Sequence, residues 1–169
     1  MGSFQSFADR MFGSGKKNAV NHSAKNGPRA INLQFASGQI VENVPWQDME
    51  SYMMLVEEGS EDFLILESSN GFLQFYGVDN HFVAEIRENL PDGDFRTFSI
   101  IDREKESLVE RISLDTPYGH FTPTEREVIS LEQITAAVTT YYENSRTEEL
   151  LKKIPYVETT EETKRYMAL

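Results

Sequence analysis

The central part of the chain consists of short apolar runs that alternate with turn-forming residues. Residues 63–67 and 72–76 are two such runs on either side of a Ser-Ser-Asn-Gly turn, which is typical of a β-hairpin. Further strands are predicted at 81–87, 95–101 and 108–114, with turns at 79–80 and 91–93 between them. Because the gaps between the runs are short, successive strands should pair antiparallel, since parallel pairing needs long crossovers.

Apolar residues recur at helical spacing on both sides of this strand region. Before it, residues 31–36 and 39–44 flank Ser37-Gly38 as a first hairpin, and Pro45 then begins a helix. The buried face of that helix should hold Trp46, Met49, Met53 and Val56.

After the strands, Ser130 and Gln133 form a capping box at the start of a second helix. Its apolar stripe consists of Leu131, Ile134, Val138 and Tyr141 or Tyr142. A shorter helical segment is predicted at 147–154, with Lys152 and Lys153 in its last turn before Pro155. Together the elements predict an α+β fold, an antiparallel sheet of about five to seven strands with helices packed on one face.

The length of 169 residues fits one well-buried core. We expect a basic, flexible N-terminal arm with a short amphipathic segment at 1–29, a single α+β domain at 30–157, and a loose polar tail at 158–169. No apolar run reaches the roughly 18 residues that a membrane-spanning helix needs. The chain lacks cysteine and a secretory signal pattern, so a soluble protein in the cytoplasm is expected.

Charge is distributed unevenly within the net charge of −12. The arm holds five Lys or Arg residues and one Asp, a net charge of +4, and the remainder carries −16. A body this acidic repels phosphate backbones, which argues against nucleic-acid binding and for a basic protein partner. Acidic surfaces are also common on soluble cytoplasmic proteins, and this simpler interpretation stays open.

The arm has an apolar stripe followed by lysines. Phe4, Phe7, Met11 and Phe12 fall at helical spacing, and Lys16 and Lys17 follow a Gly-Ser-Gly break. Such a segment can rest on an anionic membrane surface, which gives an alternative function as a peripheral membrane adaptor through Phe4, Phe7, Phe12, Lys16 and Lys17. It can equally pack on its own domain.

Residues able to perform catalysis are few. Asp79, His81 and His120 could be considered as a metal or acid-base cluster, but no two of them have a recognised ligand spacing. Asp92-Gly93-Asp94 lacks the other ligands of a calcium loop and is typical of a turn. We therefore expect no enzymatic activity, no metal and no cofactor.

The hairpin at 63–77 resembles that of the Imm-type immunity proteins of bacterial polymorphic-toxin systems. The matching residues are 63–67, 71–75 and Gly77, and residues 128–142 occupy the place of that family's C-terminal helix. The resemblance extends over about residues 31–145; the basic arm, and the lack of a tryptophan near the C-terminus, depart from the pattern. It implies a small cytoplasmic protein that binds a cognate toxin and blocks its active site without chemistry of its own.

Acidic clusters are the candidate contacts for such a partner. Glu57, Glu58, Glu61 and Asp62 form the densest group, and the first two fall at a helix C-terminus, where the macrodipole disfavours carboxylates. A second group, Glu88, Asp92 and Asp94, surrounds a turn and could share a surface with the first. Toxins that act on nucleic acid have basic clefts, which an acidic protein can occupy as a phosphate mimic. A solvated loop is the alternative interpretation of the first group.

Overall fold

The hairpin predicted at 63–77 forms the centre of the sheet. A computed structural model describes residues 31–58, 63–78, 81–116 and 119–168 of the chain. In it β3 (Phe63–Ser68) and β4 (Gly71–Val78) pair antiparallel, with Leu64 opposite Phe75 and Leu66 opposite Leu73. The two apolar runs are thus paired with each other along the ladder, as expected for a hairpin.

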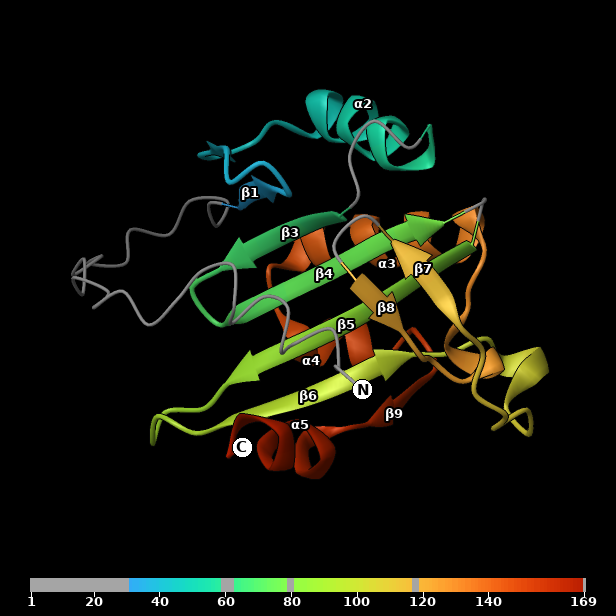
Figure 1. Cartoon of the computed structure of the whole chain (residues 1–169). Helices are drawn as coiled ribbons and strands as arrows, with labels where there is room; N and C mark the ends of the chain where they lie inside the picture. Colours follow the sequence, from blue (N-terminus) through green and yellow to red (C-terminus); the bar gives the residue numbers. More distant parts are fainter. Residues whose placement is uncertain (1–30, 59–62, 79–80, 117–118, 169) are drawn as a thin grey trace.

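Five further strands complete an antiparallel sheet of seven strands in the order β2-β1-β3-β4-β5-β6-β9 (Figure 1). They are β1 (Asn32–Phe35), β2 (Ile40–Val41), β5 (His81–Asn89), β6 (Phe95–Ile100) and β9 (Tyr156–Glu158). The first hairpin and the central meander are confirmed, and so is the α+β class. The described residues form four α-helices.

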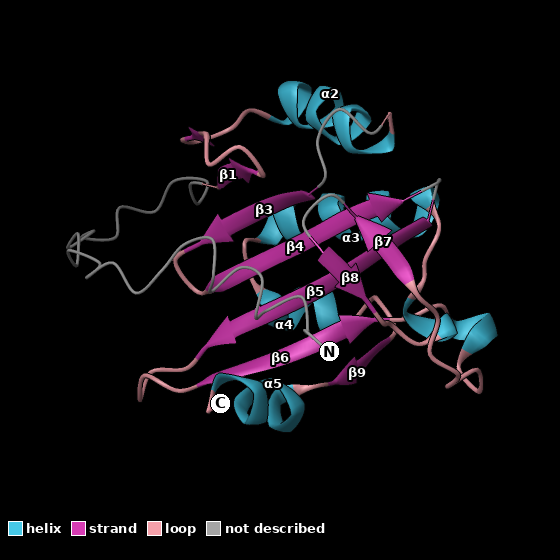
Figure 2. Ribbon diagram, viewed as in Figure 1, coloured by secondary structure: helices cyan, strands magenta, loops and turns pink. Residues whose placement is uncertain are grey.

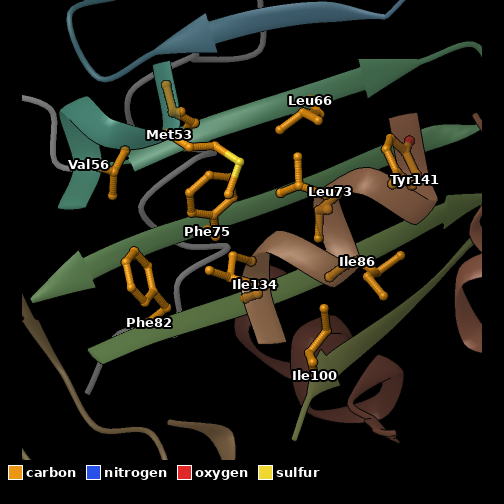
Figure 3. Packing of buried hydrophobic residues seen from close by; sticks show 14 of the residues in the cluster. Met53, Val56, Leu66, Leu73, Phe75, Phe82, Ile86, Ile100, Ile134 and Tyr141 are labelled. Carbon is orange, nitrogen blue, oxygen red and sulfur yellow. The ribbon is translucent and has the colours of Figure 1, made fainter. Parts of the chain in front are cut away.

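Three of these helices cover one face of the sheet. They are α2 (Trp46–Glu57), α3 (Leu131–Asn144) and α4 (Thr147–Leu151), and Figure 2 shows α3 and α4 behind the strands. Alternate strand residues point toward them and form the main core, which includes Phe75, Ile86 and Ile134 (Figure 3). The helix predicted at 147–154 is shorter than expected, because α4 ends at Leu151.

The start of α3 follows its sequence signal. The Ser130 hydroxyl accepts a hydrogen bond from the Gln133 backbone N–H at 3.3 Å, and the Gln133 side chain accepts one from the Ser130 N–H at 2.7 Å. Ile134, Val138 and Tyr141 are fully buried. The Tyr141 hydroxyl reaches the Ser68 hydroxyl on β3 at 3.0 Å, so the one polar group of this stripe has a partner inside the core.

The opposite face of the sheet is covered in part by a small hairpin. It consists of β7 (Leu114–Thr116) and β8 (Gly119–Phe121), which lie in front of β4 and β5 in Figure 1. The Phe121 ring packs on Tyr76 with 4.8 Å between centroids. The strand predicted at 108–114 was wrong: most of this segment is irregular, and Leu108 and Val109 are exposed. Ile112 and Leu114 are half-buried, and Leu114 begins β7.

The loose tail expected from residue 158 was also wrong. Residues Tyr156–Glu158 form the edge strand β9 on β6, and α5 (Thr160–Met167) follows. Thr160 and Thr163 of α5 are buried against Thr97, which lies on the face opposite α2, α3 and α4. A polar sequence therefore forms a regular element here because β6 supplies hydrogen-bond partners.

Gly71 is the residue of the central hairpin that tolerates a side chain least. Its φ is +144°, and a Cβ placed on it would lie 1.8 Å from the carbonyl oxygen of Arg87. Gly38 has a φ of +84° but nothing within 4 Å of such a Cβ. We expect Gly71→Ala to lower the free energy of unfolding by about 2 to 3 kcal/mol and Gly38→Ala by about 1 kcal/mol, measured by urea denaturation. Equal losses would show that the clash with β5 relaxes freely.

Candidate functional site

Helix α2 lies at the β1 side of the sheet (Figure 1), and two of its exposed residues are glutamates. Met49, Met53 and Val56 point into the core and are nearly inaccessible. Glu50 and Glu58, two turns apart, are exposed on the other side of the helix, and Met54 between them is 47% exposed. We call Glu50, Met54 and Glu58 the α2 outer face.

Aromatic contacts hold α2 in place. The Trp46 ring packs against Tyr142 of α3 with 5.1 Å between centroids, and the Tyr142 hydroxyl donates to the Val44 carbonyl oxygen at 2.7 Å. Tyr52 meets Phe35 of β1 edge-on at 5.1 Å. These contacts fix both flanks of the helix, so its outer face is presented by a rigid element.

The C-terminus of α2 carries charge of the unfavourable sign. Glu58 is the C-cap residue, its backbone N–H bonds to the Met54 carbonyl oxygen at 2.9 Å, and its side chain is exposed. The last turn contains no basic residue. Because the helix dipole is negative at this end, a carboxylate here destabilises the free helix and favours a bound cation. Of the other predicted residues in this group, Glu61 and Asp62 lie outside the described residues, as does the side chain of Glu57.

Positive charge is missing from the whole first half of the domain. Residues 31–86 contain ten Asp or Glu residues and no Lys or Arg, whereas 87–169 contain seventeen and eleven. Ion pairs among the described residues accordingly cluster in the second part, for example Arg96 with Glu158 and Lys152 with Glu149. Within the described part of the chain, Glu50 and Glu58 form no ion pair. A comparison of the charge of the arm with that of the body does not reveal this gap, because the gap lies within the body.

The carboxylates of the second predicted acidic group have partners in their own surroundings. The Asp94 carboxylate accepts a hydrogen bond from Lys164 Nζ at 2.6 Å and another from the Phe95 backbone N–H. The Lys164 bond, followed by the Phe95 bond, holds the pKa of Asp94 below its usual value. The Asp92 carboxylate accepts from the Asp94 N–H at 3.0 Å, and Glu88 lies 3.7 Å from Arg96.

The two acidic groups do not share a surface. Phe63, at the end of β3 that follows the first group, pairs with Tyr76, whereas Glu88 pairs with Gly71 at the other end of β4. Figure 1 shows the C-terminus of α2 and the β5–β6 turn at opposite ends of the sheet. For Glu58, the described side chain of the first group, the expectation of one shared surface was therefore wrong. Among the described residues, the glutamates of the α2 outer face are the candidate contacts that form no ion pair.

Asp79, one of the three residues considered as a metal or acid-base cluster, lies outside the described residues. His120 pairs with Asp115 across the β7–β8 hairpin, with Nδ1 2.7 Å from the carboxylate, and both side chains are exposed. The Ser113 hydroxyl is 3.3 Å from both ring nitrogens, so it is aligned with neither. The described residues contain no group of three or more His, Asp or Glu that could hold a metal ion.

The membrane alternative depends on residues that the structure does not describe. Phe4, Phe7, Phe12, Lys16 and Lys17 all lie outside the described ranges. Within those ranges, none of the helices has the length and apolar character needed to cross a membrane.

Comparisons with known proteins give one structural similarity. No protein-family model matches the sequence, and no curated protein matches it. Among solved structures, the chain is similar to a hypothetical protein from Neisseria gonorrhoeae, with a TM-score of 0.44 and 13% sequence identity. The similarity covers 79% of this chain and 96% of the other. It assigns neither a family nor an activity.

Proposed function

We propose that this chain is a non-catalytic inhibitor of the immunity-protein type, which binds a basic toxin domain and blocks its active site. The observation that carries the proposal is the absence of Lys and Arg from residues 31–86, together with the exposed carboxylates of Glu50 and Glu58 on either side of an exposed methionine on the α2 outer face. Elsewhere in the described chain many carboxylates have a basic partner, as Asp94 has Lys164. Charge without an internal partner on a rigid helix supports recognition of a cation-rich surface.

The composition of the α2 outer face suits such a partner. Glu50 and Glu58 would attract lysine and arginine side chains over a distance and orient the encounter. Met54 supplies a flexible apolar group between them, which gains contact area once water is excluded. A toxin that acts on nucleic acid has a cleft built for phosphates, and an acidic helix fits the same cleft. An inhibitor that occupies this cleft blocks the toxin without any chemistry of its own.

The alternative function is a peripheral membrane adaptor that uses the N-terminal arm. It invokes the apolar stripe and lysines of residues 1–29 and leaves the acidic body without a role. Anionic lipid would repel the α2 outer face. We prefer the inhibitor proposal because it gives the negative charge of the body a role.

The test is complex formation with the toxin domain encoded by a neighbouring gene. We expect titration calorimetry with the full chain to give one-to-one binding with a dissociation constant of about 10⁻⁸ M or lower, as for other tight inhibitors. Binding should weaken as salt rises, because the attraction is partly between exposed charges. Co-expression should rescue cells from the toxin.

Two results would contradict the proposal. One is the absence of any complex with the products of neighbouring genes, together with no rescue. The other is sedimentation of the full chain with phosphatidylserine vesicles that is lost when residues 1–29 are deleted, which would establish the adaptor. Phosphatidylcholine vesicles serve as the control for charge-independent adsorption.

A further inference from the structure

The outer edge of β6 is closed by a segment that buries little apolar surface. β9 pairs Tyr156, Val157 and Glu158 with Ile100, Ser99 and Phe98. Among the described side chains of α5, the two buried ones are both threonines, and Met167 is 49% exposed. A single helix of eight residues does not persist alone in water. We call residues 156–168 the C-terminal seal; its described contacts are mostly polar, beside the Tyr156 ring, which lies edge-on to Phe98 at 5.3 Å between centroids.

Threonine hydroxyls satisfy the backbone of β6 where β9 ends. The Thr97 N–H donates to the Thr160 hydroxyl at 3.0 Å, and the Thr97 carbonyl oxygen accepts from the Thr159 N–H at 2.9 Å. The Thr97 and Thr163 hydroxyls lie 2.9 Å apart in a buried position. The seal thus continues the strand ladder with side chains, and its loss would leave an open strand edge.

Within the described part of the chain, three ion pairs join the C-terminal seal to the other elements. Their N–O distances are 2.6 Å for Lys164 with Asp94, 3.2 Å for Arg96 with Glu158, and 3.2 Å for Arg111 with Glu162. Lys164 also lies over the Phe95 ring, 5.5 Å from its centroid. All these side chains are substantially exposed, so salt screens the pairs.

Low pH also weakens two of these ion pairs, those of Asp94 and Glu158. Hydrogen bonds from Lys164 and from Arg96 hold the pKa values of Asp94 and Glu158 below their usual values. Such groups stabilise the folded state above the ordinary carboxyl pKa, and the contribution is lost as pH falls through the lowered values. The other charges nearest to these pairs are Asp92 and Glu161 beside Lys164, and Glu88 beside Arg96.

From these contacts we propose that the β6 edge is a peptide-binding edge, which the C-terminal seal occupies in cis and vacates when its ion pairs are weakened. The peptide that fits this edge has an extended segment, then a residue with a hydroxyl group at the position of Thr160 and a basic residue at the position of Lys164. Strand addition of this kind obtains affinity from backbone hydrogen bonds and specificity from such side chains. A peptide with the sequence of residues 155–168 is the matching probe.

Hydrogen exchange of the full chain tests the release. Lys164→Met keeps the side-chain stem and removes the charge, and Arg165→Met is the matched control, because Arg165 is exposed on the same helix and has no ion pair among the described residues. We expect Lys164→Met to raise exchange about two- to five-fold in both 95–100 and 156–168 at low salt, with β4 unchanged. High salt should raise exchange of the wild type to the level of the variant.

Peptide binding tests the edge itself. We expect a fluorescent 155–168 peptide to bind the full-length Lys164→Met chain with a rise in anisotropy, and to bind the wild type and Arg165→Met much less. Equal exchange in the two variants would overturn the proposal, since the ion pair would then not hold the seal. Faster exchange of 156–168 without peptide binding would also overturn it, because the opened edge would accept no strand.

Discussion

Phe75→Ala is expected to lower the free energy of unfolding by about 3 to 5 kcal/mol, the largest loss we foresee for a single substitution. Phe75 is fully buried at the centre of β4, with Leu64 and Ala84 opposite it on the neighbouring strands. Its ring lies between the sheet and the helices and is 6.5 Å from that of Phe82 (Figure 3). Both neighbouring strands are fixed in register, so the cavity cannot collapse fully. Urea denaturation followed by circular dichroism measures the loss.

Two variants bracket this result. Asn70→Ala changes an exposed turn residue of the same hairpin and should cost less than about 1 kcal/mol. Ile65→Ala removes a buried side chain from the opposite face of the sheet and should cost about 2 to 5 kcal/mol. A Phe75→Ala protein as stable as Asn70→Ala would mean that the hairpin is not the centre of the core.

The elements that could be predicted are those whose signals are local. The capping box of Ser130 and Gln133 lies within four residues and needs no knowledge of the fold. The hairpin at 63–77 likewise combines two apolar runs with a turn that places Gly71 at positive φ. Signals of this kind arise from neighbouring residues, and the structure forms them as expected.

The elements that could not be predicted depend on distant partners. α5 is polar, and its anchors, Thr97 and Asp94, are more than 60 residues away in the sequence. The segment at 108–114 has apolar residues like a strand, but its bridge to the rest of the fold is the isolated pair Arg111 and Thr124. Composition and periodicity contain no information about such contacts.

In the candidate site, too, local features could be predicted from the sequence, whereas contacts with distant residues could not. The position of Glu58 at a helix C-terminus was readable from the sequence. Asp94 was not readable as a paired residue, since Lys164 lies seventy positions further on. Met54 was missed because its neighbour Met53 fits the buried stripe, although one residue of helical rotation moves a side chain by 100° and places Met54 on the outside.

Reversal of charge on the α2 outer face is expected to slow association with a basic partner by about an order of magnitude at low salt. The variant is Glu50→Lys with Glu58→Lys, two exposed positions on one helix. The control is Glu132→Lys with Glu143→Lys on α3, which alters net charge equally at exposed positions on another helix. Stopped-flow binding to the neighbouring toxin domain at two ionic strengths measures both pairs.

The association rate should depend on where the charge is reversed. A general effect of net charge would instead slow both double variants alike. Encounter rates respond to charges near the contact, and screening reduces that response. We therefore expect the α2 variant alone to lose its salt dependence, while the α3 variant keeps an association rate within about two-fold of the wild type. Equal slowing would show that the acidic body acts as a whole. An unaltered rate in both would exclude the α2 outer face and move the contact to the remaining acidic positions, Glu61 and Asp62 beyond the end of α2, or Asp92 and Asp94 at the β5–β6 turn.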